Sequence, residues 1–423
     1  MSNAKKYIIA DNINLFIIKD VKYKTVFAAT YLHRDLSREE VTLNSLLSNV
    51  LKSSTASHPS MNELSVYAQE LYGCGFDVSV SKKASVQSIV SSVSTLSNRF
   101  SEAGIEEKAY ELMLDLIFKP DVKNGAFNAE YVENQKKNLK DDIESLVNDK
   151  RSYANVRCIE EMCKGEKNAI VEVGYVEDID PINAQNLYSH YLSIVTSSPI
   201  DIFVVGDVDT DCLTHFFKEY FSRFEFDIKP LKLELSDNAT NDVRYVEDNL
   251  DVNQGKLAMG LRTGINLESQ LYYPLLVGNS ILGSGPHSKL FNNVREKLSL
   301  CYYAYSRLDK YNSLMLIGSG IEFDKFDQTK SAIIEEIDNV KNGNFTDDDI
   351  AVAKEYIIGS YISYNDSPSL LADYYLGLSF TDSLASLEEA VERVKAVTKE
   401  QILEAFSTLK LDTVYFLNGK ESK

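Results

Sequence analysis

The five histidines of the chain are the side chains best suited to bind a metal ion, so their spacing is the first test for chemistry. They are His33, His58, His190, His215 and His287. A hydrolytic zinc site on a helix places two ligands at i and i+4, as in H-x-x-E-H, and adds a carboxylate that takes a proton from water. None of the five has a second histidine three to five residues away. The sequence therefore predicts no helical zinc site, and His190 and His215 are expected to be ordinary helix residues.

The cysteines and glycines give no other reaction centre. Five cysteines are present, Cys74, Cys158, Cys163, Cys212 and Cys301. Their number is odd and their spacing fits no common zinc knuckle, so we expect reduced thiols in a reducing compartment. The chain has no P-loop and no G-x-S-x-G motif. The glycine-rich segment 283–288 follows a predicted helix and contains proline, which is typical of a flexible loop and not of a dinucleotide-binding turn.

Composition limits the classes of partner. The chain has 423 residues, 44% of them hydrophobic and 25% charged, which is ordinary for a globular protein of roughly two to four domains. The net charge of −19 argues against nucleic acid or an anionic membrane, because both bind basic patches. The charge is compatible with cationic peptides, although it also simply keeps a surface hydrated.

The chain shows no targeting segment. Residues 1–10 lack a basic start followed by an apolar stretch, so no signal peptide is expected. No segment approaches the about 20 apolar residues that span a bilayer. The expected location is the cytoplasm.

The first half of the chain, residues 1–225, mixes strands and helices. Leu43, Leu46, Leu47, Val50 and Leu51 recur at the spacing of one buried helical stripe. Short β-branched and aromatic runs predict strands, and periodic apolar runs predict helices. The predicted strands are 14–18, 25–31, 76–81, 86–95 and 200–205, and the predicted helices are 43–51, 61–71, several within 105–164, and 181–192.

The second half, residues 255–423, repeats this order after a charged segment, 226–254, that we interpret as a linker. The predicted strands are 256–261, 302–308, 314–320 and 413–417, and the predicted helices are 271–282, 290–298 and three or four within 326–406. Residues 46–51 also resemble residues 276–282. A repeat of about 200 residues indicates a duplicated domain, and each copy is α/β or α+β.

The order of these features resembles the insulinase/pitrilysin family of zinc peptidases, especially its mitochondrial processing peptidase-like branch. In that family H-x-x-E-H lies on the helix after the opening strands. The matching positions here are Asn44, Leu47 and Ser48, so both histidines and the glutamate are replaced. A later family motif, E-R-x-x-V-x-x-E-I, supplies the last zinc ligand, and it matches the segment from Gln135 to Asp142, of which only Asp142 could bind a metal.

The second half keeps more of the family pattern. The family has a glycine-rich loop, then S-x-L-F, then R-E-x-x-x-L-x-Y. This chain has the loop 283–287, then 288–291, then Arg295 and Tyr302 seven residues apart. The resemblance makes Arg295 and Tyr302 candidates for peptide contact. The alternative is structural, with the arginine in a salt bridge at a helix end and the tyrosine packed in the sheet.

The resemblance implies an α+β fold of two homologous halves, each a mixed, mostly antiparallel sheet packed against helices. It also implies a catalytically inactive homologue. Leu47 cannot accept a proton, Asn44 and Ser48 are poor ligands, and Asp142 alone cannot hold zinc. We therefore expect no catalytic residues and no bound cofactor, zinc included.

Three functions remain open. The first is a non-catalytic subunit that binds peptide or unfolded polypeptide and pairs with an active homologous zinc peptidase, or with itself, because the chain also resembles a bacterial subgroup in which such pairs are common. The second is a standalone peptide-binding or scaffold protein. The third is a zinc peptidase with a rearranged site that uses Asp142 with His33 or His58.

Overall fold

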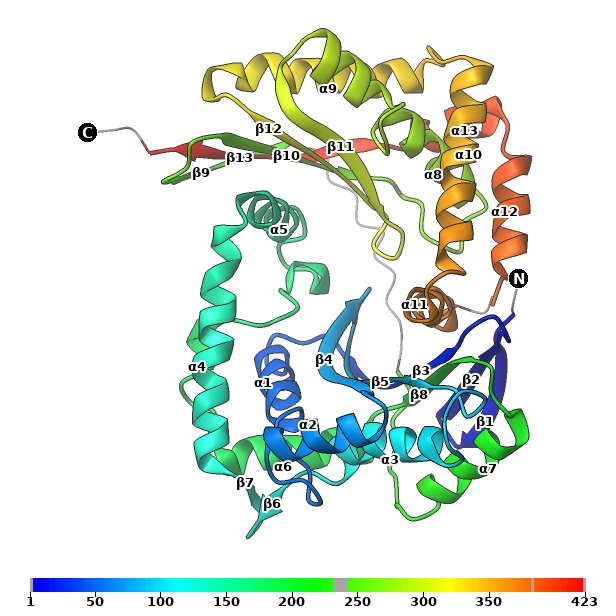
Figure 1. The fold of residues 1–423 in the computed structure, drawn as a ribbon. Coiled ribbons are helices and arrows are strands. Elements are labelled where there is room, and N and C mark those ends of the chain that lie inside the picture. The colour runs from blue at the N-terminus through cyan, green and yellow to red at the C-terminus, as the bar shows by residue number, and fades with distance from the viewer. Residues whose placement is uncertain (1–2, 232–241, 382–383, 421–423) are drawn as a thin grey trace. The chain divides into compact units, whose positions relative to one another are not determined.

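The computed structural model describes residues 3–231, 242–381 and 384–420 (Figure 1). The chain forms two compact units. The first unit consists of Met1–Glu144, Ile170–Leu233 and Tyr364–Ser386, and the second of Ser145–Ala169, Glu234–Ser363 and Leu387–Lys423. The units therefore differ from the sequence halves 1–225 and 255–423, because each unit contains one segment of the other half.

The sheet of the first unit has six strands, and only the β2–β8 pair is parallel. In spatial order they are β1 (Lys5–Ala10), β2 (Ile13–Lys19), β8 (Ile200–Gly206), β3 (Thr25–Asp35), β5 (Val86–Leu96) and β4 (Gly75–Lys83). Strand β8 is buried along its whole length, as expected for a central strand covered on both faces.

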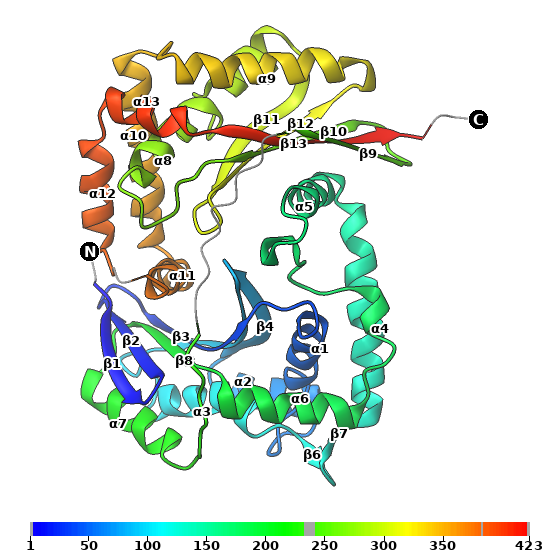
Figure 2. The same cartoon turned by 180° about the vertical axis from the view of Figure 1, so that it is seen from behind.

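Helices cover both faces of this sheet. They are α1 (Val41–Leu51), α2 (Met61–Glu70), α3 (Ile105–Phe118), α4 (Ala129–Ser145), α6 (Ala184–Ser197), α7 (Thr210–Phe221) and α11 (Pro368–Ser379), with the short hairpin β6 (Val122–Lys123) and β7 (Ala126–Phe127) and the turn η3 (Val176–Asp178). Figure 1 and Figure 2 show α11 on the face opposite α3 and α7. Local caps start several helices: Asn183 forms a capping box for α6, and Asp209 accepts two backbone N–H groups of α7.

The sheet of the second unit has five strands, and only the β9–β13 pair is parallel. In spatial order they are β11 (Cys301–Asp309), β12 (Leu314–Ile321), β10 (Gly255–Arg262), β13 (Lys410–Gly419) and β9 (Arg244–Leu250). Read from β9 to β11, this order matches the first sheet read from β2 to β4, strand by strand. Within the described residues, the second sheet has no counterpart of β1.

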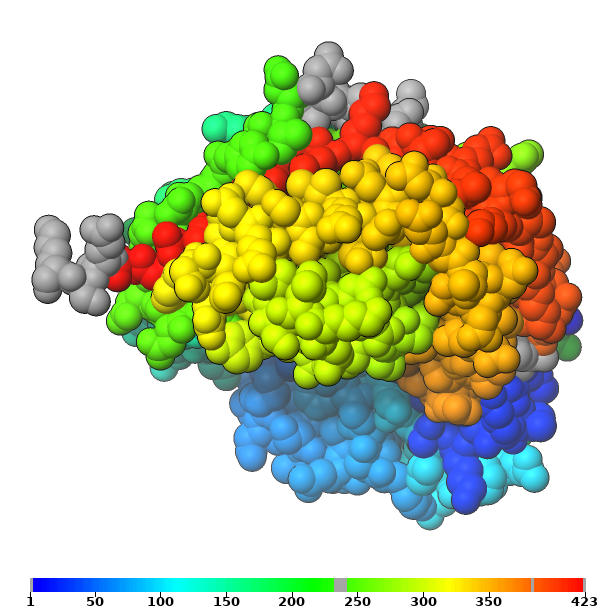
Figure 3. Space-filling view, turned by 90° about the horizontal axis from the view of Figure 1, so that it is seen from above, coloured from blue at the N-terminus to red at the C-terminus, as the bar shows by residue number. Residues whose placement is uncertain are grey.

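Helices also cover the second sheet on two sides. They are α5 (Lys150–Met162), α8 (Tyr272–Leu282), the π-helix η4 (Leu290–Lys297), α9 (Phe326–Lys341), α10 (Asp347–Tyr364), α12 (Leu387–Ala396) and α13 (Lys399–Ser407), with short turns η1 (Leu146–Asn148), η2 (Lys167–Ala169) and η5 (Phe323–Lys325). Figure 3 shows α9 and η4 side by side on one face of the second unit. Helix α5 packs on β10 and β13 from the opposite face (Figure 1).

The duplicated, mostly antiparallel α+β fold expected from the sequence is thus confirmed. Three local predictions were wrong. The segment 226–254 contains strand β9, so it is not only a linker. Strand β1 and the β6–β7 hairpin were missed. Five helices, α9 to α13, lie in the described parts of 326–407, where three or four were expected.

None of the helices described in this structure combines the length and the apolar character that crossing a membrane requires.

Candidate functional site

The three positions of α1 that match the family's zinc motif provide neither a set of metal ligands nor a general base. Asn44 is almost fully buried, its amide nitrogen donates to Oε1 of Gln87 at 2.8 Å, and its Oδ1 lies 2.7 Å from Nε2 of His190. Gln87 in turn donates through Nε2 to the backbone carbonyl of Glu172 at 2.7 Å. The first ligand position of the motif is therefore the middle of a continuous hydrogen-bond chain.

The direction of the hydrogen bonds in this series follows from which atoms can donate a proton. An amide oxygen only accepts, so Nε2 of His190 carries the proton that bonds to Asn44. Burial lowers the pKa of His190, against an opposing effect of the nearby carboxylate of Glu40. The surroundings of His190 therefore favour the neutral imidazole. The sequence predicted an ordinary helix residue, and its contact with α1 had no signal in local spacing.

The other two positions on α1 are packed. Leu47 is 0% exposed and belongs to the hydrophobic core of the first unit. Ser48 is also buried, and its hydroxyl donates to the carbonyl of Ser45 at 2.8 Å. The position that holds the general base in the family is thus a core position here.

The segment 170–174 lies against the beginning of α1. The backbone carbonyl of Glu172 accepts the hydroxyl of Ser45 at 3.4 Å, and its carboxylate accepts the backbone N–H of Lys82 at 2.7 Å. Gly174 has φ +87, and a Cβ there would lie 2.3 Å from Oγ1 of Thr42. Only glycine permits both the conformation and the close approach, so the segment is fitted closely to the helix.

The downstream positions on α4 do not complete a metal site. The amide of Gln135 donates to the hydroxyl of Ser53 at 3.2 Å, and Asp142 is an exposed residue. No three His, Cys, Asp or Glu side chains in the described residues are grouped to hold a metal ion. The zinc ion of the family therefore does not fit the residues present.

The histidines of the rearranged-site hypothesis have other contacts. His33 lies on β3 with Nδ1 2.7 Å from the hydroxyl of Ser88 and Nε2 3.3 Å from Asp201. The ring of His58 stacks on Tyr67 with centroids 4.5 Å apart. Within the described parts of the chain, neither histidine joins Asp142 in a metal-binding group.

Arg295 and Tyr302, the candidates for peptide contact, lie in the second unit. Arg295 is on the π-helix η4, with Cζ 4.6 Å from the centroid of the Phe291 ring and Nη1 3.2 Å from Glu296. Tyr302 is the second residue of β11 and is 59% exposed, with its hydroxyl 3.5 Å from Glu322. The tyrosine ring is therefore accessible, and the role in peptide contact stays a prediction.

The histidine of the glycine-rich loop before η4 holds the loop in place through contacts with two neighbouring helices. Nε2 of His287 lies 3.1 Å from the hydroxyl of Ser280, and its ring centroid is 5.1 Å from that of Tyr356. Gly285 has φ +109, a conformation that favours glycine. Loop geometry, and not a phosphate cradle, accounts for the glycine.

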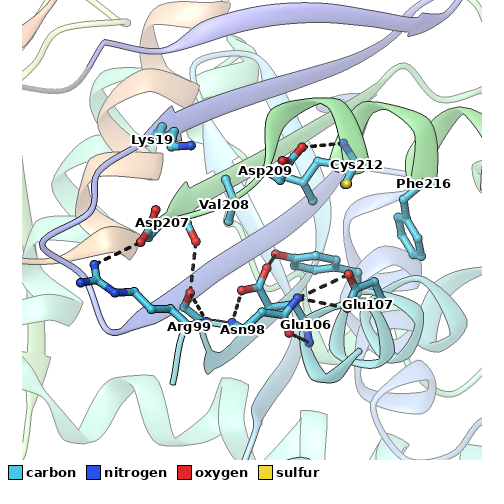
Figure 4. Close-up of a pocket in the computed structure, with 13 residues that line it drawn as sticks. Lys19, Asn98, Arg99, Glu106, Glu107, Asp207, Val208, Asp209, Cys212 and Phe216 are labelled. Atoms are coloured by element: carbon cyan, nitrogen blue, oxygen red, sulfur yellow. Dashed lines mark hydrogen bonds and ion pairs between the residues drawn. The ribbon is translucent and has the colours of Figure 1, made fainter. Parts of the chain in front are cut away.

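A cavity of about 370 Å³ lies in the first unit, among the ends of β2 and β5 and the starts of α3 and α7 (Figure 4). Burial raises the pKa of Glu106, whose carboxylate accepts the hydroxyl of Tyr110 at 3.1 Å and the backbone N–H of Asn98. At the rim, a hydrogen bond to Asp209 raises the pKa of the Cys212 thiol. The raised pKa makes Cys212 a poor nucleophile, and no sequence motif indicates this cavity.

Asp201 is a buried carboxylate on β8 whose contacts predict a pH dependence. Its oxygens lie 2.9 Å from the amide of Asn14, 3.3 Å from Nε2 of His33 and 3.3 Å from the hydroxyl of Ser379. Burial raises the pKa of Asp201, but the bonds and charge of His33 and the bond of Asn14 lower it more, so the pKa lies below its usual value. The stabilisation is thus present above the unfolded-state pKa of about 3.9 and is lost as pH falls through the folded-state pKa.

We therefore expect Asp201→Asn to lower the free energy of unfolding by about 2 kcal/mol at pH 7, and to reduce the further loss on acidification below pH 4. Urea unfolding at pH 7, 5 and 3 measures both effects. Asp141→Asn, at an exposed position of α4, is the control and should change neither. Equal acid sensitivity of Asp201→Asn and the unsubstituted protein would contradict the assignment.

Comparisons with known proteins identify relatives of this chain. The family profile of the peptidase M16 inactive domain matches residues 181–357. A probable inactive metalloprotease of Bacillus subtilis, YmfF, is 34% identical over 407 residues, covering 96% of this chain and 95% of the relative. An uncharacterized zinc protease of the same organism, YmxG, is 23% identical over 233 residues, or 54% of this chain and 56% of that protein.

Solved structures show the same architecture along the whole chain. A conserved protein from Enterococcus faecalis V583 superimposes with a TM-score of 0.92 at 28% identity, with 100% of both chains covered. A peptidase M16 inactive domain from Pseudomonas fluorescens gives 0.82 at 16% identity, covering 100% of this chain and 99% of that one.

The chain has a duplicated α+β fold, and the helix that carries the zinc ligands in the family lacks them here. These two features define an inactive metallopeptidase homologue. The chain belongs to the peptidase M16 family, which confirms the insulinase/pitrilysin resemblance of its motifs.

Proposed function

We propose that this chain is a non-catalytic, peptide-binding subunit that pairs with an active homologous zinc peptidase. The observation that carries the proposal is the state of α1. The helix keeps its place in the fold, but Asn44 is tied into a hydrogen-bond chain and Leu47 is part of the core. The chain thus retains the architecture of the family but lacks the zinc ligands and the general base.

Two further facts support pairing. Bacillus subtilis has both a relative named as probably inactive and one named as a zinc protease, so the two kinds of homologue occur in one organism. Tyr302 also exposes its ring beside Glu322 in the second unit, where a partner or peptide can reach it.

The side chains of the subunit support proposals about its cellular location, its zinc content and its ligands. None of the five cysteines is in a disulfide bond, which fits a reducing compartment such as the cytoplasm. We propose that the chain binds no zinc by itself, because Asn44, Ser48 and Asp142 form no ligand set. The net charge of −19 favours cationic polypeptides over nucleic acid or membrane.

An affinity capture of the full chain from its own cells, read by mass spectrometry and zinc analysis, tests pairing. We expect a homologous chain with an H-x-x-E-H motif to co-purify and to bring zinc that the isolated chain lacks. Recovery of the chain alone, as monomer or homodimer, would contradict pairing and favour the standalone binding protein. Stoichiometric zinc in the isolated chain would instead support a rearranged metal site.

A further inference from the structure

Two tyrosine rings and an arginine form a layered arrangement on the second sheet, on the face that α5 covers. Tyr303 and Tyr305 lie two residues apart on β11, so their side chains share one face. Their ring centroids are 6.0 Å apart and the planes differ by 27°. Cζ of Arg151, at the start of α5, lies 4.6 Å from the first centroid and 4.2 Å from the second. One guanidinium group therefore rests on two aromatic rings.

The neighbouring strand is shaped to receive these rings. Tyr303 pairs with Gly320 and Tyr305 with Gly318 across β11 and β12. A Cβ on Gly320 would lie 2.4 Å from Cε1 of Tyr303, and one on Gly318 would lie 2.6 Å from Cζ of Tyr305. The two glycines leave a strip without side chains, and the two rings lie against it. We call Tyr303, Tyr305 and this strip the tyrosine platform.

The platform is held in place independently of Arg151. The amide of Asn155 donates to the hydroxyl of Tyr305 at 2.7 Å, and the strand pairing fixes the backbone beneath both rings. Arg151 is itself exposed and makes no ion pair within the described residues. The guanidinium is thus held mainly by cation–π attraction, which is weak at an exposed site and readily exchanged for an equivalent cation.

The charges around the platform also suit a cationic ligand. Asp149, the N-cap of α5, lies close enough to act electrostatically on Tyr303 and on Lys256. The ammonium group of Lys256 is 5.9 Å from the Tyr303 ring at the edge of the platform. Asp149 also offers a counter-charge to Arg151 when that side chain leaves the rings, since the two residues already interact electrostatically.

We propose that the tyrosine platform is a subsite for a cationic side chain of a bound peptide, above all arginine, and that Arg151 occupies it when no peptide is bound. The guanidinium plane stacks on aromatic rings better than an ammonium does, so the subsite prefers arginine to lysine. The proposal rests on the peptide-binding part of the proposed function and does not depend on pairing with a homologue.

Binding of fluorescent peptides to the purified full chain tests the subsite, with fluorescence anisotropy as readout. The probes are one unstructured peptide with a central arginine and the same peptide with glutamine there. Arg151→Ala frees the platform, so we expect about fivefold tighter binding of the arginine peptide and no change for the glutamine peptide. Removing the rings by Tyr303→Leu with Tyr305→Leu should abolish the preference for arginine.

Arg393→Ala is the matched control, because Arg393 lies over a single ring, Tyr273, at 5.7 Å, and it should leave both affinities unchanged. Thermal unfolding of each variant verifies that it is folded. Unchanged or weaker arginine-peptide binding by folded Arg151→Ala would overturn the proposal and make Arg151 a fastening of α5. Arginine-independent peptide binding would overturn the subsite alone, whereas pairing is judged separately by the affinity capture.

Discussion

Leu47→Glu, which restores the carboxylate of the family motif, is expected to destabilise the protein by about 3–5 kcal/mol and to create no peptidase activity. Leu47 is 0% exposed and packs in the core of the first unit. A carboxylate placed there loses its hydration, and burial of an unpaired charge is among the most destabilising changes known. Urea unfolding monitored by circular dichroism measures the loss, and a peptide-cleavage assay with added zinc tests activity.

The control for this change is Leu192→Glu on α6, where the leucine is 43% exposed. The same substitution there should alter the free energy of unfolding by less than about 1 kcal/mol. Equal stability of the two variants would show that position 47 faces water, and would reopen the possibility of a catalytic base on α1.

Arg262→Leu is expected to lower the free energy of unfolding by about 3 kcal/mol, because it breaks a buried ionic network. Nε of Arg262 lies 3.0 Å from Asp412, which is 0% exposed, and Nη2 lies 2.7 Å from Glu166. Nη2 also donates to the carbonyl of Met162 at the end of α5. Burial lowers the pKa of Arg262, but its bonds to Glu166 and Asp412 raise it on balance, so the arginine stays charged. Without it, the buried Asp412 keeps its 3.3 Å contact with Nη2 of Arg244 but loses its contact with Arg262.

Thermal and urea unfolding of Arg262→Leu measure this effect. Arg223→Leu is the control, because its ion pair with Glu219 at 2.8 Å involves side chains that are 57% and 61% exposed, and exposed pairs contribute about 0–1 kcal/mol. A loss no larger than that of the control would mean that apolar packing alone fastens α5 to the second sheet.

The two sheets have a similar contact between a basic side chain and a buried aspartate at equivalent positions. Leu32 pairs with Ile200 in the first sheet and Leu261 with Leu411 in the second. The residue after each of these leucines, His33 or Arg262, contacts a buried aspartate on the neighbouring strand. Asp201 contacts Ser379 of α11, and Arg262, which contacts Asp412, also contacts Met162 of α5. The first unit uses a histidine for this contact, and the second uses an arginine.

Most elements of the fold could be predicted because local patterns are strong. The leucine stripe of α1 and the β-branched runs of β5 and β8 carry their own periodicity. Strand β9 was missed because its sequence, Arg244 to Leu250, is charged. It is an edge strand with alternating half-buried and exposed residues. It is held in the sheet by pairing with β13.

The content of the candidate site depended on contacts that sequence spacing does not reveal. The absence of H-x-x-E-H was enough to predict an inactive centre. The replacement, in which His190 bonds to Asn44, joins residues 146 positions apart. The tyrosine platform likewise depends on Arg151 meeting a strand 150 residues later, so no local motif indicates it.

The exchange of α5 and α11 between the sequence halves has a consequence for biosynthesis. The first unit includes Tyr364–Ser386, and α11 packs on β8 and β3. A nascent chain that has left the ribosome only as far as residue 363 holds nearly all of the first sheet, yet one apolar face of it still lacks its helix. Domains of multidomain chains usually fold as units during synthesis, but here the first unit stays incomplete until α11, Pro368–Ser379, has been made.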